Sequence, residues 1–419
     1  MKKRRHIIQI FCCALLTSAW LLLNSASAQL SPNARFSVLT CSPGPDLYSL
    51  FGHSAFRLVD TIGFRPVDVV FNYGTFDAFD NSFYTKFARG KLDYKLQVEY
   101  FDGFIESYAM EGRGVWEQEL LLNSLQRQRL FSLLQSNVEE ENCVYRYDFF
   151  YDNCSSRIRD MTIRAVAQEP TDSFGFRYVS LKKLLEVNEV KFSQPCAQGT
   201  TYREAIQTYL NYQPWSDFGI DIALGRPCDD VIGTYGFMFL PDSLMREFEC
   251  ASINGSPLCK APVELLPNQS ALSVNGWLTP LAVVLLWLAL HTWIVYRNRA
   301  AKVTLLAADC VLLGVTSLVS LLVVFLWFFT DHTATQGNWN LLWANPANII
   351  LLFFYRNRSV IRIIAWVNLL ACSFMVISFP WLPQSLHIAT IPIALMLIIT
   401  AVRLYRNARI IEKQTLFSS

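Results

Sequence analysis

The chain has 419 residues, of which 52% are hydrophobic and only 17% are charged, a balance typical of a membrane protein. The net charge of +2 conceals a segregation, because residues 29–277 hold 22 Lys and Arg side chains against 31 Asp and Glu side chains. A segment this acidic is unsuited to binding nucleic acid, which we exclude as a partner.

Residues 1–28 have the pattern of a secretory signal peptide. Four basic residues at positions 2–5 precede an apolar run over 7–23, and the small residues at 26–28 form a cleavage site before Gln29. We expect cleavage there; an uncleaved anchor is the alternative, since the apolar run is near spanning length. In either case the segment that follows is exported.

Residues 29–272 are expected to form an exported domain of the α+β class. Residues 55–59 and 67–73 have strand character, and residues 124–137 have the apolar spacing of a helix. A second helix is expected to begin at Cys154, with Asn153 as its N-cap. Residues 251–277 are rich in Ser, Pro, Asn and Gly and read as the linker to the membrane.

Residues 273–419 are expected to form an all-α membrane domain of five transmembrane helices. The third segment is short and contains Asn345 and Pro346, so a broken or partly re-entrant helix is an alternative there. The five apolar segments lie near 278–296, 303–329, 340–355, 360–378 and 387–404.

The loop charges predict the orientation of this membrane domain. Lys and Arg are concentrated near 297–302, near 356–362 and in the tail after 403, whereas loops 330–339 and 379–386 contain none. By the positive-inside rule the basic connections and the C-terminus are cytoplasmic. The exported domain then lies on the opposite, non-cytoplasmic side of the membrane, in agreement with the signal peptide.

Seven cysteines lie in the mature exported domain, and this odd number predicts disulfides plus one free thiol. Cys250 and Cys259 bracket a short stretch with Gly and Pro and form the easiest local pair. We expect Cys154 to be the free thiol, because its place at a helix start favours the thiolate.

Cys154 and His53 are the expected catalytic pair. His53 is the only histidine of the mature exported domain, and Cys and His are the minimum pair for thiol catalysis. The backbone N–H groups at the start of the helix could also hold the oxyanion of an acyl intermediate. Ser54, beside the histidine, is expected to be a structural hydroxyl and not a nucleophile.

A third polar residue should orient His53. Asp68 and Asn72 alternate onto one face of the following strand, and Asn72 is the first choice, with Asp68 second. Asp152, Tyr151 and Asn153 are further candidates for orientation or for the oxyanion site. The sequence has no zinc-ligand spacing, phosphate-binding glycine loop or serine-nucleophile elbow.

Short motifs give the chain a family resemblance. Residues 52–56 (GHSAF) followed by 152–154 (DNC) resemble the circularly permuted branch of the papain-like NlpC/P60 superfamily, as in relatives of lecithin:retinol acyltransferase. A closer resemblance, over nearly the whole chain, is to Lnb-type bacterial lipoprotein N-acyltransferases. The motifs that carry it are 40–44 (TCSPG), 48–53 (YSLFGH), 71–74 (FNYG), 149–154 (FFYDNC), 340–343 (NLLW) and Asn345-Pro346.

This resemblance implies a reaction. An acyl chain would move from a membrane phospholipid to Cys154, and then to the α-amine of the diacylglyceryl-cysteine that begins a lipoprotein. Phospholipid and diacylated lipoprotein would be the partners, and neither a metal nor another cofactor is needed. Two alternatives stay open: a periplasmic cysteine amidase that cleaves peptidoglycan, and a non-enzymatic membrane scaffold with Cys154 in a disulfide.

Overall fold

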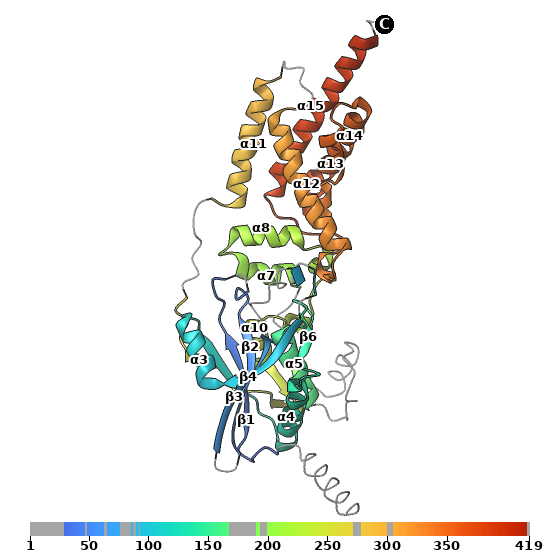
Figure 1. The fold of residues 1–419 in the computed structure, drawn as a ribbon. Coiled ribbons are helices and arrows are strands. Elements are labelled where there is room, and N and C mark those ends of the chain that lie inside the picture. The colour runs from blue at the N-terminus through green and yellow to red at the C-terminus, as the bar shows by residue number, and fades with distance from the viewer. Residues whose placement is uncertain are drawn as a thin grey trace, which may run out of the picture.

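The structure is a computed structural model with an N-terminal α/β domain and a C-terminal helical domain of membrane type (Figure 1). The predicted signal peptide lies outside the residues that it describes. Those residues are 29–46, 48–62, 65–75, 85–86, 89–91, 93–166, 190–192, 199–270, 278–299 and 305–416.

The α/β domain is built on a seven-stranded antiparallel sheet in the order β10-β5-β1-β2-β3-β4-β6. The predicted strands 55–59 and 67–73 are confirmed, since they lie inside two neighbouring central strands. The strands are β1 (Arg35–Cys41), β2 (His53–Ile62), β3 (Arg65–Thr75), β4 (Asp93–Tyr100), β5 (Val115–Glu119), β6 (Val144–Arg146) and β10 (Val263–Leu266).

Alternation along the strands gives this sheet two apolar faces. One face forms the main core with helices α4 (Ser124–Val138), α5 (Cys154–Val166) and α10 (Pro241–Cys250). The other face packs against α3 (Phe101–Met110). The predicted helix at 124–137 is therefore confirmed as α4, which a capping box between Asn123 and Gln126 begins. The papain-like circular permutation stays a prediction.

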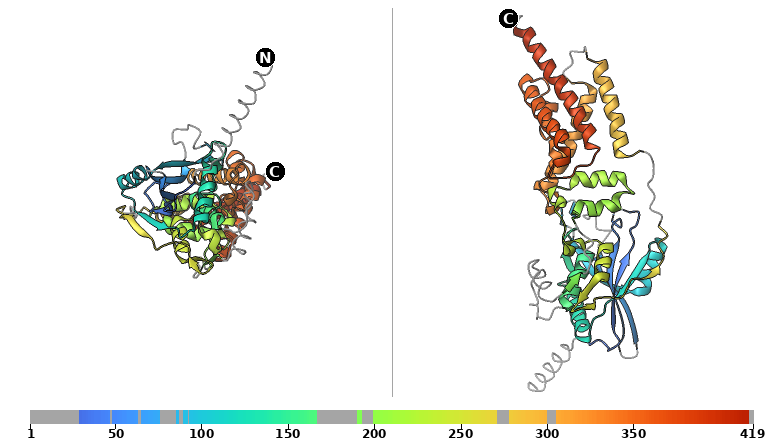
Figure 2. Two further views of the ribbon diagram at one scale, coloured as in Figure 1. Left: turned by 90° about the horizontal axis from the view of Figure 1, so that it is seen from below. Right: turned by 180° about the vertical axis from the view of Figure 1, so that it is seen from behind.

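A three-stranded sheet and several short helices complete the domain. Helices α7 and α8 lie between the large sheet and the helical domain in both side views (Figures 1 and 2). These elements are β7 (Val190–Phe192), β8 (Ala251–Ile253), β9 (Ser256–Pro257), α7 (Tyr202–Leu210), α8 (Pro214–Ala223), η1 (Arg226–Asp229) and α9 (Thr234–Phe237).

The described part of the helical domain has four helices long and apolar enough to span a membrane, not the five predicted. The third predicted segment is broken: η3 (Trp339–Leu342) is separated from α13 (Ala347–Phe353) by a turn at Pro346. Seven helical residues rise only about 10 Å. The candidate spans are α11 (Pro280–Arg297), α12 (Ala307–Phe328), α14 (Arg358–Ser378), which η4 (Phe379–Trp381) continues, and α15 (Thr390–Leu416); η2 (Thr333–Thr335) follows α12.

The broken segment nevertheless lies inside the bundle, where its polar groups are satisfied by protein. Asn348 is fully buried; its Nδ2 donates to Thr316 Oγ1 of α12 (3.2 Å), and its Oδ1 accepts from Asn368 Nδ2 of α14 (2.7 Å). Irregular backbone at membrane depth needs such partners, because lipid offers none.

The structure contains no disulfide among the described cysteines. Cys250 and Cys259, the predicted local pair, are not joined by a disulfide, and Cys259 Sγ donates to the carbonyl of Phe248 (3.2 Å). Cys196 lies outside the described residues. The predicted pattern of disulfides with a single free thiol is therefore unconfirmed.

Candidate active site

Three elements meet at the N-terminal end of α5. Strand β2 begins at His53, β3 carries Asn72 near its end, and α5 begins at Cys154 and packs against both strands. Gly52 makes the turn into β2 with φ +77°, and a Cβ there would lie 2.7 Å from the carbonyl oxygen of Cys41. Glycine is thus required where the chain places His53 at the strand start.

Asn153 caps the helix that presents the thiol, as predicted. Asn153 Oδ1 accepts from the N–H of Ser156 (2.9 Å), and Ser156 Oγ accepts from the N–H of Asn153 (2.7 Å). The first N–H groups of a helix have no intrahelical acceptor, so the helix itself does not use those of Cys154 and Ser155, which lie beside the thiol. The site therefore has the positive end of a helix next to its sulfur.

Hydrogen bonds set the tautomer of His53. Its Nε2 lies 2.7 Å from Asn72 Oδ1, and Asn72 Nδ2 donates to Glu99 Oε1 (2.8 Å). A carboxylate only accepts, so Glu99 turns the amide nitrogen of Asn72 toward itself and the amide oxygen toward the imidazole. Nε2 then carries a proton, and Nδ1 is the nitrogen left to accept a proton from Cys154.

Cys154 and His53 shift each other's pKa. Desolvation alone would raise the pKa of the Cys154 thiol, but the charge and hydrogen bond of His53, the N–H of Ser54 and the Ser155 hydroxyl lower it below its ordinary value. Desolvation opposes the imidazolium, yet Cys154 and Asn72 raise the pKa of His53. Both shifts favour a thiolate–imidazolium pair, the reactive form of a catalytic cysteine.

Gly74 lies next to this pair. Gly74, at φ +91°, sits at the bulge between β3 and β4, and a Cβ there would lie 3.8 Å from both Cys154 Cβ and His53 Cε1. The same point is 3.9 Å from the hydroxyl of Tyr145. Among the described residues this hydroxyl is buried without a hydrogen-bond partner, and burial raises its pKa well above the ordinary value. It is a protonated donor near the pair, and no acceptor for it lies in the part of the chain that the structure describes.

Two family models match the chain. The model of the Lnb N-terminal periplasmic domain matches residues 23–185, and that of the Lnb transmembrane domain matches residues 272–411. The chain belongs to the Lnb family. Its N-terminal domain is thus of the periplasmic kind, and the protein is membrane-bound. No curated protein and no solved structure is a significant match.

The match to the Lnb periplasmic domain includes Cys154, His53, Asn72 and Glu99, which form a line of successive hydrogen-bond partners. Residues 199–270, which include α7 and α8, lie outside both family models. The hydrogen-bond line is therefore part of the family domain, whereas this chain's junction between sheet and bundle is not covered by either match.

The remaining predicted site residues have structural contacts. Asn153 Nδ2 donates to the carbonyls of Phe149 and Phe239 (2.8 Å each), and Asp152 forms an ion pair with Arg157. Tyr151 is partly exposed, with its ring against Tyr202.

The second choice for the orienting residue is engaged elsewhere. Asp68 binds Arg57 through two hydrogen bonds of 2.7 and 2.8 Å, whereas Asn72 is the residue that reaches His53. Ser54 is fully buried, with its Oγ 3.1 Å from Ser155 Oγ, in agreement with the structural hydroxyl predicted for it.

Sequence reasoning missed Glu99 and Tyr145. Asn72 pairs with Gln97 across β3 and β4, so Glu99 is its diagonal neighbour on the same face. Alternation along β4 would have placed Glu99 on the same face as Asn72, but only if the register between the two strands had been known. Tyr145 lies on the three-residue edge strand β6, which is too short to be recognised from the sequence.

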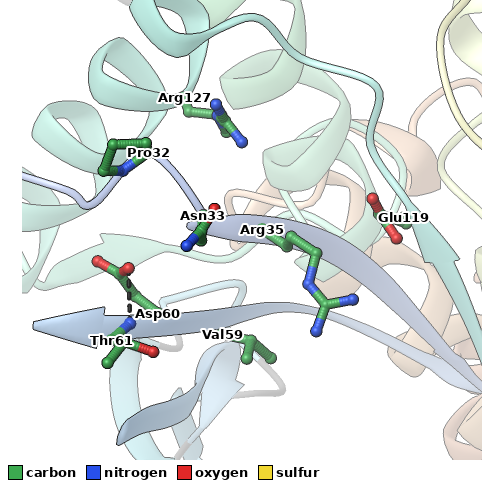
Figure 3. A pocket seen from close by; sticks show the side chains of 8 residues that line it. All are labelled: Pro32, Asn33, Arg35, Val59, Asp60, Thr61, Glu119 and Arg127. Carbon is green, nitrogen blue, oxygen red and sulfur yellow. Dashed lines mark hydrogen bonds between the residues drawn. The ribbon is translucent and has the colours of Figure 1, made fainter. Parts of the chain in front are cut away.

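A polar cavity of about 500 Å³ lies at the other end of β1 and β2 (Figure 3). His53 and Val59 are six residues apart on β2, about 20 Å at the rise of a strand. The cavity is therefore separate from the thiol site, and its charged lining is unlike a path for an acyl chain. It is lined by Pro32, Asn33, Arg35, Val59, Asp60, Thr61, Glu119 and Arg127.

Proposed function

We propose that the protein is a lipoprotein N-acyltransferase that works through a thioester on Cys154. The observation that carries this proposal is the line Cys154–His53–Asn72–Glu99 at a helix N-terminus, in an Lnb-family chain whose helical domain is of membrane type. Membership of the Lnb family supports this kind of reaction. The substrates and the mechanism below are our proposal.

In the first half-reaction the Cys154 thiolate attacks an ester carbonyl of a membrane phospholipid. A carbon–sulfur bond forms, and collapse of the tetrahedral intermediate breaks the ester carbon–oxygen bond. The imidazolium of His53 gives its Nδ1 proton to the departing alkoxide, which leaves as lysophospholipid. Asn72 and Glu99 hold the imidazole in the tautomer that this transfer needs.

In the second half-reaction the α-amine of a diacylglyceryl-cysteine attacks the thioester. The carbon–nitrogen bond forms, the carbon–sulfur bond breaks, and His53 Nδ1 takes a proton from the amine. The products are an N-acylated lipoprotein and the starting thiolate–imidazolium pair. The sequence of steps needs no metal and no energy-rich cofactor.

The oxyanion of each tetrahedral intermediate would be held by the N–H groups of Cys154 and Ser155 and by the hydroxyl of Tyr145. Such donors are most effective when they are fixed before the reaction and buried from water. Asn153, Asp152 and Tyr151 would support the site less directly, through the helix cap, the ion pair with Arg157 and the packing on Tyr202.

The proposed setting is the bacterial inner membrane, with a cleaved signal peptide at 1–28, the exported domain over 29–272 and the membrane domain over 273–419. The C-terminus would then be cytoplasmic. Phospholipid and diacylated lipoprotein would both reach the site from the outer leaflet, on the side of the exported domain.

The test is mass spectrometry of lipoprotein N-terminal peptides from cells with and without the gene. We expect the third, amide-linked acyl chain to disappear on deletion and to return with the wild-type gene but not with Cys154→Ser. Unchanged acylation after deletion in cells without a second such enzyme contradicts the proposal. Altered peptidoglycan peptides with normal lipoproteins would favour the amidase alternative.

A further inference from the structure

Helix α8 lies across the end of the helical bundle that faces the sheet (Figures 1 and 2). Its Trp215 Nε1 donates to the carbonyl of Leu278, just before α11 (2.9 Å). On the same helix, Phe218 and Ile222 belong to the apolar core of the bundle. By sequence α8 is part of the exported region, but by packing it is part of the membrane domain.

Three amide side chains from the bundle bind the C-terminal end of α8. We call Asn338, Asn340 and Gln384 the amide clasp; all three are at most 2% exposed. Asn338 Nδ2 donates to the carbonyls of Ile222 (2.8 Å) and Ala223 (3.2 Å).

Asn340 and Gln384, the other two members of the clasp, bind further carbonyls at the same end of α8. Asn340 Nδ2 donates to Asp221 O (3.2 Å) and Ile222 O (3.3 Å), and Gln384 Nε2 donates to Leu224 O (2.8 Å). A helix leaves its last carbonyls without intrahelical donors, and here side chains from another part of the chain supply them.

The clasp is also braced internally. Asn338 Oδ1 accepts from the N–H of Asn340 (3.0 Å), and Gln384 Oε1 accepts from the N–H of Trp339 (2.8 Å). Asn340 Oδ1 accepts from Trp343 Nε1 (2.8 Å). Each amide therefore has its oxygen and its nitrogen bound, which fixes its orientation. A buried network in this state is rigid, and breaking one bond leaves polar groups without partners.

A continuous set of contacts leads from α8 to the thiol. Arg203 of α7 forms ion pairs with Asp221 of α8 and with Asp229 of η1. Tyr202 precedes Arg203 on α7, and its ring packs on the ring of Phe239, with the two centroids 5.5 Å apart. The carbonyl of Phe239 in turn accepts from Nδ2 of Asn153, the residue that caps the helix of Cys154.

We infer that the amide clasp positions Cys154 at a fixed height and angle above the bilayer, so that the thiol meets the ester of a membrane-embedded acyl donor. This inference rests on the proposed function. Reaction requires the sulfur to come within about 3–3.5 Å of the carbonyl carbon, and a small misplacement lowers the rate steeply. A thiol on a loosely tethered domain would sample many heights, whereas one held through α8 samples few.

The clasp residues are positioning residues, because none of them touches the thiol or its partners. A merely stabilising role would predict that clasp variants lose all thiol chemistry in proportion to the folded protein lost. A positioning role predicts a split. Reaction with an acyl donor held in the bilayer falls, while reaction with a soluble ester, which can approach from any direction, does not.

The experiment compares these two donors with full-length protein in phosphatidylethanolamine nanodiscs. The membrane donor is the phosphatidylethanolamine itself, followed as the acyl-enzyme by intact mass, and the soluble donor is p-nitrophenyl butyrate. The test variant is Asn340→Asp, which keeps the shape but loses both donor hydrogens. The control is Asn298→Ala, since Asn298 Nδ2 also donates to a helix carbonyl, that of Ile294, but outside the clasp and on α11.

We expect Asn340→Asp to form the acyl-enzyme from phosphatidylethanolamine at least tenfold more slowly, with turnover of the soluble ester within twofold of wild type. If Asn340→Asp does not fold, Gln384→Ala should show the same split. Equal loss with both donors, or no loss with either, overturns the inference while leaving the proposed function intact. If wild-type protein forms no Cys154 acyl-enzyme at all, the proposed function and this inference fall together.

Discussion

At the scale of single residues, two opposing causes set the pKa of Cys154: desolvation raises it, and His53 with the nearby hydrogen-bond donors lowers it further than desolvation raises it. Removal of the imidazole leaves desolvation largely unopposed. In His53→Ala the pKa of the thiol should therefore rise above its ordinary value, and the thiolate fraction at neutral pH should fall.

The measurement is the rate of alkylation of Cys154 by iodoacetamide as a function of pH. We expect His53→Ala to slow the reaction at pH 7 by roughly tenfold or more, with recovery only at alkaline pH, because the thiolate is the nucleophile. Cys143, a partly exposed cysteine of the same domain, is the internal control and should react alike in both proteins. Equal rates at Cys154 would remove His53 from the ionisation of the thiol.

Asn72 and Glu99 are expected to act through His53. Without Glu99 the Asn72 amide can flip and present its nitrogen, which selects the wrong tautomer of the imidazole. We expect acyl-enzyme formation to fall about 100-fold in Asn72→Ala and about tenfold in Glu99→Ala, with the folded fraction unchanged.

The discriminating variant is Glu99→Gln. Glutamine keeps an oxygen that can accept from Asn72 Nδ2, so the rate of acyl-enzyme formation in Glu99→Gln should stay close to that of wild type. A loss in Glu99→Gln as large as in Glu99→Ala would show that the carboxylate charge, and not the orientation of the amide, is what matters.

At the scale of elements, the bulge at Gly74 brings the backbone of β3 close to Cys154 and His53. Gly74→Ala should destabilise the protein by about 1–3 kcal/mol, because φ +91° strains any residue with a Cβ. Gly74→Leu should in addition block acyl-enzyme formation, since its side chain would extend over Cys154 and His53.

The matched control for this strain is Gly103→Ala. Gly103 lies in α3 with open space at its Cβ position, so alanine should stabilise the protein by about 1 kcal/mol. Thermal unfolding and acyl-enzyme formation are measured for all three variants. Normal acylation in Gly74→Leu would place the acyl donor on another side of the thiol.

Local patterns predicted several of these elements well. Asn153 before an amphipathic stretch gave the start of α5, and alternation along β3 gave Asn72 as the partner of His53. Glu99 could not be predicted in the same way. Its contact with Asn72 depends on the register between β3 and β4. A bulge shifts that register, and a long connection lies between the two strands in the sequence.

The membrane domain shows the same limit of local reasoning. Hydropathy located the four helices that are able to span a membrane. The structure of the third segment could not be predicted from its own sequence, because Asn348 is tolerated there only through its hydrogen bonds to α12 and α14. The amide clasp was invisible from the sequence, since Asn338 and its acceptor Ile222 are 116 residues apart. Single Asn and Gln residues carry no pattern.

At the scale of the whole molecule, the predicted topology depends on whether the broken segment crosses the membrane. The segment begins at η3, where Asn340 binds a carbonyl of α8. The C-terminal end of α14 leads within a few residues to Gln384, which binds the carbonyl just after α8. Asn357, the N-cap of α14, then lies a helix length away, about 31 Å for 21 residues. We therefore expect the segment between η3 and α14 to cross the bundle.

With four spanning helices and one broken crossing, we expect the exported domain and the C-terminus on opposite sides of the membrane. Reporter fusions within 255–270 and after Ser419 should accordingly give periplasmic and cytoplasmic signals. The Lys and Arg bias of the loops points the same way. Signals from one compartment at both positions would mean an even number of crossings and would exclude this arrangement.

The most direct test of the proposed mechanism is intact mass spectrometry of the purified full-length protein after incubation with phosphatidylethanolamine. The thioester mechanism predicts one acyl-sized mass increase on Cys154, absent in Cys154→Ser, lost on treatment with hydroxylamine, and discharged when a diacylglyceryl-cysteine peptide is added, with the acyl chain recovered on the peptide amine. An adduct on another residue, or an acyl chain that the peptide amine does not take up, would contradict it.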